Sequence, residues 1–352
     1  MKGFSITLII AHHICGQLFH ENPKWFSILS YQGVNAFFLL SGIGLTYSLL
    51  SKNEAKQNIH DWVNWYLKRS IRILPSYWIV LLTTFFLFLI GCHLLSIRVS
   101  KNFNLALFDF AAHFFLINIY FKATFYSINV AWWFLATIAH FYLFFPLLFN
   151  LCKNKKTRFS LVIFILLLEQ FNRKFHFING QISLSFVFFS TGIFLAFYLQ
   201  DITEKFIKQY PFLLFVAFFC LSSALLCSLT DLIPNILGTY DFLLFSLFFV
   251  SFLYVVSFLG VDFLESRSSS VTSGWGLNGR LIAKTIRFVF EILGKNSYAL
   301  FLIHWGFIHP VFVRFSNFFV GLFVFSAIIL FSSIILTSLD NTITSFFSFK
   351  ES

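Results

Sequence analysis

The first twenty residues, MKGFSITLIIAHHICGQLFH (residues 1–20), form an apolar run that carries an unusual number of polar side chains. A helix that crosses the hydrocarbon core of a bilayer needs about 20 mainly apolar residues, and residues 3–21 meet that length. Ionisable side chains inside a bilayer are costly and usually face a cavity or a partner. His12, His13 and His20 therefore indicate that this helix does more than anchor the chain.

The composition is that of an integral membrane protein. Hydrophobic residues make up 58% of the 352 residues and charged residues 11%, whereas an average soluble domain is about a quarter charged. A net charge of +11 would suggest a nucleic-acid partner in a soluble protein. Here the simpler explanation is retention of Lys and Arg on the cytoplasmic side of a lipid bilayer, so no nucleic-acid partner is expected.

Ten apolar runs are predicted to span the membrane, some with help from their flanks. An eleventh run, 105–121, is ambiguous because it is short and contains Asp109, His113 and Asn118. The ten predicted spans are 3–21, 33–51, 73–97, 131–151, 159–171, 184–200, 211–230, 241–261, 297–312 and 318–338.

The distribution of basic residues decides how the run 105–121 is treated. With a cytoplasmic N-terminus and no crossing by 105–121, 18 of the 25 Lys and Arg residues fall in cytoplasmic segments. A crossing there would move the basic segment KNKKTR (153–158) outside, against the positive-inside rule. We therefore predict an all-α polytopic membrane protein of about ten transmembrane helices with both termini cytoplasmic.

The chain is predicted to form a single integral-membrane domain over residues 1–352. Residues 98–130 would be an outer connection with a possible non-crossing helix. Residues 262–296 would be a cytoplasmic connection that includes a Ser- and Gly-rich stretch, 265–280. The N-terminal run has no small-residue cleavage site, so we expect it to be retained. The five cysteines have neither CxxC nor zinc-binding spacing, so free thiols and no metal site are expected.

Polar residues form a stripe along the first predicted helix. Lys2 and His13 are eleven residues apart, which is three helical turns plus about 20°, so they share a face about 16 Å apart. Gln17 and His20 continue this stripe, whereas His12 points about 100° away. The stripe is consistent with a functional site, and ordinary interhelical hydrogen bonds are the alternative.

A basic cluster precedes the third predicted span in WYLKRSIRILPSYW (65–78). Lys68, Arg69 and Arg72 make up this cluster, and the two arginines share a helix face at i and i+3. Two guanidinium groups placed in this way can grip phosphate bidentately. A simple juxtamembrane anchor is the alternative. Pro75 is expected to mark a helix start or a kink.

Two other runs have packing explanations. In GVNAFFLLSGIGLTYSLL (33–50), Gly42 and Gly44 beside Ser41 predict a close approach of two helices. The aromatic residues of AWWFLATIAHFYLFFPLL (131–148) fit a belt at the outer membrane interface. Neither run, taken alone, indicates a catalytic function.

The late stretch LGKNSYALFLIHWGFIHP (293–310) contains two more histidines, His304 and His309. Both are predicted to lie at membrane depth or at its outer edge. Each could be an ordinary hydrogen-bonding group between helices or a functional group that faces a cavity. The sequence leaves both readings open.

These five stretches, in this order, resemble the membrane-bound acyltransferase 3 family of bacterial sugar O-acyltransferases. The first span of that family carries an arginine, ten residues and then a histidine, to which Lys2 and His13 correspond. Two departures are Asn35, where many members have aspartate, and Ile138, where many have glutamate. The other motifs of the family are matched by FFLLSG (37–42), RSIRILPSYW (69–78), Trp133, Phe134, Leu135, Phe141, Tyr142, Leu143, Pro146, Ser297, Tyr298 and His304.

The resemblance implies a multi-pass enzyme of the bacterial cytoplasmic (inner) membrane. Such an enzyme moves an acyl group, usually acetyl, from cytoplasmic acyl-CoA to a hydroxyl of an envelope glycan or a lipid-linked sugar. Acetyl-CoA would be a co-substrate, and no bound cofactor is expected. O-antigen of lipopolysaccharide, capsule and exopolysaccharide are all open as acceptors.

The resemblance and the stripe together suggest roles for individual residues. Lys2, Arg69 and Arg72 would hold the phosphates of the donor. His13 would act as general base on the acceptor hydroxyl, or would carry the acyl group covalently. Supporting roles are open for His12, Gln17, His20, Asn35, Ser41, Tyr142, Tyr298 and His304.

Two other classes of protein were weighed. Lipid-linked glycan flippases and polymerases are also apolar proteins with many spans, but they need neither the Lys2–His13 stripe nor the arginine pair. A haem protein would need two histidines matched at one depth, and the histidines here are scattered along the chain. The acyltransferase is therefore the favoured function.

Overall fold

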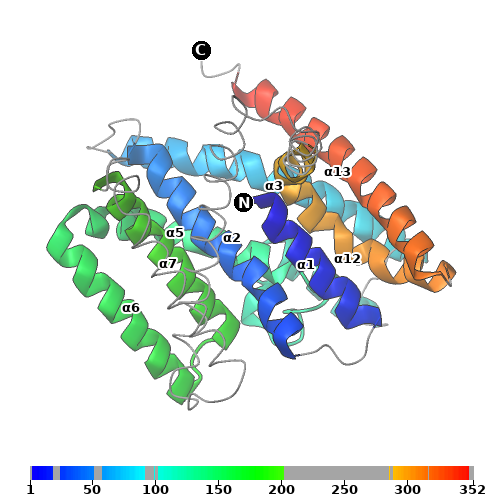
Figure 1. The fold of residues 1–352 in the computed structure, drawn as a ribbon, viewed down its shortest axis with the longest axis horizontal. Helices are drawn as coiled ribbons and strands as arrows, with labels where there is room; N and C mark the ends of the chain where they lie inside the picture. Colours follow the sequence, from blue (N-terminus) through cyan, green and yellow to red (C-terminus); the bar gives the residue numbers. More distant parts are fainter. Residues whose placement is uncertain are drawn as a thin grey trace, which may run out of the picture. The chain divides into compact units, whose positions relative to one another are not determined.

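The computed structural model describes residues 2–18, 24–50, 58–91, 99, 102–201, 285, 288–315 and 317–348 (Figure 1). Helices dominate these ranges, and no β-strand occurs within them. The predicted spans 211–230 and 241–261 lie outside the described residues, as do His20 and most of the connection 262–296.

The chain divides into two compact units. Unit 1 comprises residues 1–9, 23–53 and 147–294. Unit 2 comprises residues 10–22, 54–146 and 295–352. Each unit therefore draws on segments that are distant in sequence.

Five described helices are long and apolar enough to cross a membrane. The prediction of an all-helical, multi-pass membrane protein is thus confirmed, whereas the count of ten spans and the cytoplasmic termini stay predictions. The five are α2 (Lys24–Leu50), α3 (Ile59–Leu89), α5 (Trp133–Lys153), α7 (Gly180–Asp201) and α13 (Phe318–Ser348).

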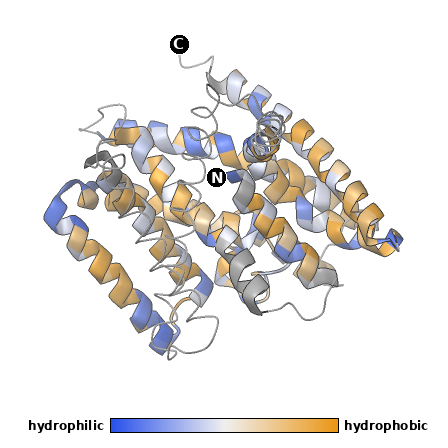
Figure 2. Ribbon diagram, viewed as in Figure 1, coloured by the Kyte–Doolittle hydropathy of each residue, from blue (hydrophilic) through white to orange (hydrophobic). Residues whose placement is uncertain are grey.

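Three more helices coincide with predicted runs. They are α1 (Lys2–Leu18), α6 (Lys155–Phe175) and α12 (Ser297–Arg314). The short run 159–171 extends into its flanks, as predicted, because α6 continues in both directions. Figure 2 shows hydrophilic residues at both ends of α6 and hydrophobic residues between them.

In unit 1, α2 packs against α7, and α6 lies beside α7 (Figure 1). A Cβ atom at Gly42 would fall on the carbonyl oxygen of Phe189 and 3.0 Å from the backbone nitrogen of Ile193. A Cβ atom at Gly192 of α7 would likewise fall on the carbonyl oxygen of Leu39 in α2. Gly42 therefore permits the close helix approach that the sequence predicts. At Gly44, by contrast, no atom of the described residues lies within 4 Å of the Cβ position, so a close approach at Gly44 stays a prediction.

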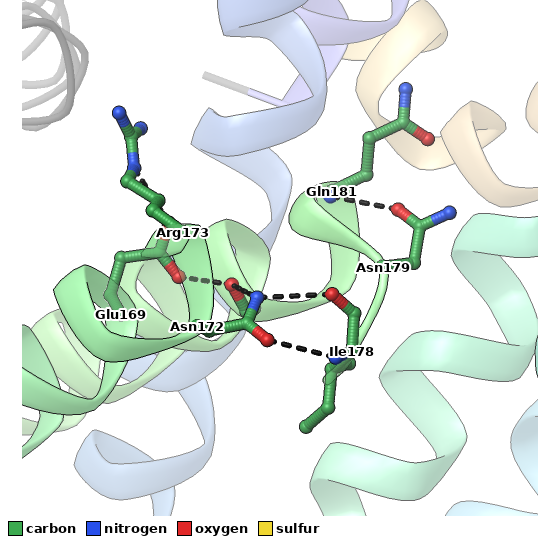
Figure 3. A network of polar contacts seen from close by, with 7 residues as sticks. Glu169, Asn172, Arg173, Ile178, Asn179 and Gln181 are labelled. Atoms are coloured by element: carbon green, nitrogen blue, oxygen red, sulfur yellow. Dashed lines mark hydrogen bonds and ion pairs between the residues drawn. The ribbon is translucent and has the colours of Figure 1, made fainter. Parts of the chain in front are cut away.

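The turn between α6 and α7 is held by buried polar side chains (Figure 3). The amide nitrogen of Asn172 donates to Ile178 O at 3.0 Å and to Ser183 Oγ at 2.9 Å. Its amide oxygen accepts from Ile178 N at 2.8 Å. Glu169, 3% exposed, pairs with Arg173 at 3.1 Å and accepts a hydrogen bond from Ser183. The network therefore satisfies a carboxylate and an amide that are both buried.

In unit 2, α3 begins well before the position that the sequence suggests. Asn58 and Asp61 form a capping box in which each side chain accepts from the other residue's backbone N–H at 2.9 Å. This box satisfies two unpaired donors of the first turn, so the helix starts at Ile59. Pro75 lies inside α3, and the prediction that it could mark the helix start is wrong.

Helix α3 is joined by side-chain hydrogen bonds to α12 and α13. Tyr298 of α12 donates to Ile73 O at 2.7 Å, and Ser76 donates to Asp340 of α13 at 2.8 Å. Both bonds lie within one turn of Pro75. These three helices therefore form one packed group within unit 2.

The ambiguous run 105–121 overlaps a short helix, α4 (Phe103–Phe114). Twelve residues rise about 18 Å, less than the hydrocarbon core of about 30 Å. The ring of Phe110 lies 4.6 Å from that of Phe85, and Phe114 O accepts from Trp78 Nε1 at 3.1 Å. The helix therefore runs antiparallel along α3, back toward the middle of that helix.

Candidate functional site

His13 lies in a cluster of aromatic rings in unit 2. Its ring centroid is 5.2 Å from that of His304, 5.1 Å from that of Trp305 and 5.4 Å from that of His12. His304 is fully buried, and His13 is half-buried. The imidazole of His13 therefore faces helix α12, where it lies beside a second imidazole, that of His304.

The hydrogen bonds of His304 determine which of its ring nitrogens carries the proton. Nδ1 lies 3.1 Å from Leu300 O and 2.9 Å from Phe301 O. Carbonyl oxygens only accept, so Nδ1 must donate. Nε2 is buried and has no hydrogen-bond partner among the described residues. A neutral His304 therefore presents a bare Nε2 lone pair, which is the form that a base or a hydrogen-bond acceptor needs.

Two other histidines of unit 2 are held in the same manner. His113 Nδ1 donates to Asp109 O at 2.9 Å, and His140 Nδ1 donates to Ala136 O at 2.7 Å. In each case the partner is the carbonyl four residues earlier in the helix. Burial on the short helix α4 lowers the pKa of His113 to about 4, against a smaller opposing effect of the bond to Asp109. His113 is therefore neutral near pH 7.

Arg69 lines a pocket between α3, α5 and the residues that follow α4. The pocket has a volume of about 230 Å³. The guanidinium also lies 5.6 Å from the ring centroid of Trp65, a cation–π distance. The residues that line the pocket are Tyr66, Arg69, Ser70, Ile73, Leu74, Phe115, Leu116, Ala139, His140, Tyr142 and Leu143.

Arg72 does not line this pocket. It is exposed and acts electrostatically on Asp340, the carboxylate that Ser76 binds from α13. Arg69 and Arg72 still lie within electrostatic range of each other. Of the predicted arginine pair, only Arg69 lines the pocket, and Arg72 lies about one helical turn further along α3.

Tyr298 connects the Arg69 pocket to the histidine cluster. Its hydroxyl binds the carbonyl of Ile73, which lines the pocket. His304 lies six residues further along α12, a rise of about 9 Å. Of the residues predicted as supporting, Tyr142 lines the Arg69 pocket, Tyr298 binds the carbonyl of a residue that lines it, and His304 lies further along α12.

Three predicted site residues belong to unit 1. Lys2 is exposed, Asn35 is 1% exposed, and Ser41 is half-buried beside Gly42. Gln17 belongs to α1. The roles predicted for these residues, and for His20, stay predictions.

Sequence reasoning did not assign His113 and His140 to the site. Their bonds to the carbonyl at i−4 are local, yet the sequence does not reveal whether a histidine in a helix adopts them. His140 lies six residues, nearly two helical turns, after the aromatic WWF run (132–134), and that proximity was the available signal. Among the described residues, no three His, Cys, Asp or Glu side chains gather as a metal site requires.

The fold and the site define a class: a helical, multi-pass membrane protein with buried histidines beside an arginine-lined pocket. A family model described as an acyltransferase domain matches residues 1–339. The chain belongs to this family, acyltransferase 3, and is a membrane acyltransferase. No curated protein and no solved structure matches the chain.

Proposed function

We propose that the protein is an O-acyltransferase that moves acetyl from cytoplasmic acetyl-CoA to a hydroxyl of a cell-envelope sugar, in the bacterial inner membrane. Membership of the acyltransferase 3 family supports acyl transfer as the chemistry. The further identification of donor and acceptor rests on the Arg69 pocket and on the histidine pair.

The pairing of His13 with His304 is the observation that carries the proposal. The two rings are 5.2 Å apart, although 291 positions separate the residues in the chain. A buried imidazole with an unpartnered Nε2 costs about 1–3 kcal/mol of stability. Such a cost has a simple explanation if a substrate hydroxyl or a transferred proton satisfies that nitrogen during the reaction.

In the proposed reaction, Arg69 and Arg72 bind the phosphates of the donor by charge-assisted hydrogen bonds. The thioester arm of the donor runs from the Arg69 pocket along α12, where Tyr298 and His304 lie. The predicted contribution of Lys2 to donor binding stays a prediction.

The acceptor hydroxyl loses its proton to His13 while its oxygen attacks the thioester carbonyl carbon. The C–S bond then breaks, and the departing CoA thiolate takes up the proton. His304 accepts a hydrogen bond through Nε2 and helps to orient the reacting hydroxyl or His13. A covalent acyl-His13 intermediate is the alternative, in which the same bonds form and break in two steps.

Replacement of His13 by Ala tests the proposal most directly. General-base catalysis is typically worth about 10²–10⁴-fold, so we expect His13→Ala to lower acetyl transfer by that factor. Radiolabelled acetyl-CoA and membranes that contain the glycan acceptor provide the measurement. The control is His309→Ala, which removes an exposed imidazole from α12. Normal glycan acetylation in a well-expressed His13→Ala strain would refute the proposal.

Replacement of Arg69 tests donor binding separately from catalysis. A charge-assisted hydrogen bond contributes about 1.5–3 kcal/mol, so Arg69→Ala should raise KM for acetyl-CoA about 10- to 100-fold. Arg69→Lys should recover part of this loss, because it keeps the charge but not the bidentate geometry. Lys68→Ala, an exposed neighbour on α3, is the matched control. Equal effects of Arg69→Ala and Lys68→Ala would argue for a general surface charge.

A further inference from the structure

A second pocket lies on the connection that precedes α5. It has a volume of about 350 Å³ and shares no lining residue with the Arg69 pocket. The positive-inside pattern predicts that this connection starts and ends on the outer side of the membrane. The residues that line the pocket are Leu105, Phe108, Asp109, Lys122, Ala123, Tyr126 and Ser127.

The lining of this pocket combines groups of opposite hydrogen-bonding character. Asp109 is 7% exposed and lines the pocket together with Ser127, whose hydroxyl donates to Thr124 O at 3.0 Å. Lys122 supplies a donor, and the exposed ring of Tyr126 supplies an aromatic face. A carboxylate repels phosphate, and an ammonium repels a metal ion. A neutral polyhydroxyl compound, whose hydroxyls both donate and accept, suits both groups.

Unsatisfied polar groups lie further inward on the same connection. His113 follows Asp109 by one helical turn, and its Nε2 is buried with no hydrogen-bond partner among the described residues. The amide nitrogen and the amide oxygen of Asn118 are also buried with no hydrogen-bond partner among the described residues. Each such group costs about 1–3 kcal/mol when it stays unpaired. Neither residue lines the pocket, so the indication of a polar ligand comes from the pocket lining itself, and these groups show only that polar side chains continue into the protein beside it.

Hydrogen bonds attach the connection to α12 close to His304. Asn129 Nδ2 and Trp132 Nε1 both donate to Leu302 O, at 3.3 and 3.0 Å. Asn129 is two residues after Ser127, which lines the pocket, and His304 is two residues after Leu302. The chain geometry then puts the pocket edge on the order of 15 Å from His304. A sugar unit in the pocket would therefore be near the reacting unit of a glycan but would not itself reach His13.

We propose that this pocket is a subsite for a non-reacting sugar unit of the acceptor, so that the enzyme acetylates an oligosaccharide or a lipid-linked chain in preference to a single sugar. The inference rests on the proposed O-acyltransferase function and adds the length and chemical class of the acceptor. Asp109 and Lys122 bind ring hydroxyls, and Tyr126 packs against the apolar face of the ring.

The test compares long and short acceptors with purified full-length protein in detergent. Oligosaccharides released from the glycan of the producing strain are the long acceptors, and methyl glycosides of its component sugars are the short ones. We expect Asp109→Asn and Tyr126→Ala to lower kcat/KM for the oligosaccharides about 10-fold. The rates with methyl glycosides should stay unchanged. Phe103→Ala, an exposed aromatic position of α4 outside the pocket, is the control.

Equal losses with both kinds of acceptor, or no loss with either, would overturn the subsite. Oligosaccharide binding, measured by saturation-transfer NMR, separates this result from failure of the proposed function. If the unaltered protein acetylates neither acceptor, the proposed function fails. The pocket is then supported if the oligosaccharides bind to the unaltered protein and Tyr126→Ala abolishes that binding. Any other result rejects the pocket.

Discussion

Buried polar groups are hydrogen-bonded to different extents in two regions of the molecule, the turn between α6 and α7 in unit 1 and the histidine-containing part of unit 2. In unit 1, Asn172 and Glu169 are buried, and both are fully engaged at the turn between α6 and α7. In unit 2, by contrast, His304 Nε2, His113 Nε2 and the Asn118 amide are buried without hydrogen-bond partners among the described residues. Unpaired groups lower stability, and unit 1 also has one among its described residues, the hydroxyl of Thr46. The polar turn between α6 and α7 avoids this cost, whereas the region around His304, His113 and Asn118 carries several such groups.

After His13→Ala, the largest expected effect comes from His304. If its bare Nε2 serves the reaction, His304→Ala should lower kcat for acetyl transfer about 100-fold. His304→Gln should retain more activity, because the glutamine oxygen can accept a hydrogen bond near the position of Nε2. Initial rates with saturating acetyl-CoA measure the effect, and thermal unfolding in detergent checks that each variant folds.

His309→Ala is again the control for loss of an imidazole from α12. A merely structural role of His304 would lower the unfolding temperature of both His304 variants and leave the kcat of the folded fraction normal. That outcome would remove the contrast between the two regions.

Gly42 gives the next largest effect, on stability rather than on rate. Overpacking of a close contact costs about 1–3 kcal/mol, and a methyl group at Gly42 would meet the backbone of α7. We expect Gly42→Ala to fall at the upper end of that range. Gly44→Ala should be neutral or slightly stabilising, because no described residue lies within 4 Å of its Cβ position and alanine favours helix. Denaturation of both variants in the same detergent gives the comparison, and equal stability of the two would contradict the close crossing of α2 and α7.

The polar turn of unit 1 is expected to contribute less. Asn172→Ala removes three hydrogen bonds from a buried site and should cost about 2 kcal/mol. Asn179→Ala removes one exposed bond, from Gln181 N at 2.9 Å, and should cost about 1 kcal/mol. Neither change should alter kcat for acetyl transfer. Unfolding curves and initial rates, measured on the same preparations, test both statements, and a loss of rate in a stable Asn172→Ala variant would assign unit 1 a share in the chemistry.

Features that depend on local sequence were predicted well. Apolar runs lead to helices α2, α3, α5, α7 and α13, because only a helix satisfies the backbone of a single apolar segment in lipid. The start of α3 was also readable, since Asn58 and Asp61 have capping-box spacing, yet Pro75 drew the prediction too far along the chain. The motifs around His13 and Arg69 led to the correct family.

Features that depend on distant partners were not predictable in this way. Gly42 and Gly44 look alike in sequence, and only the crossing with α7 separates them. That Arg69 lines a pocket and Arg72 does not likewise depends on where α5 lies.

The sequence by itself determined that this chain is helical, lies in a membrane, and carries an imidazole three turns from a positive charge on one helix. These properties follow from composition and from a helical repeat of 3.6 residues. Only the tertiary structure decided that His304 meets His13 and that Asn129 and Trp132 bind α12 beside it. The physical reason is that such contacts join residues more than 160 positions apart, and helix periodicity carries no information about which helices become neighbours.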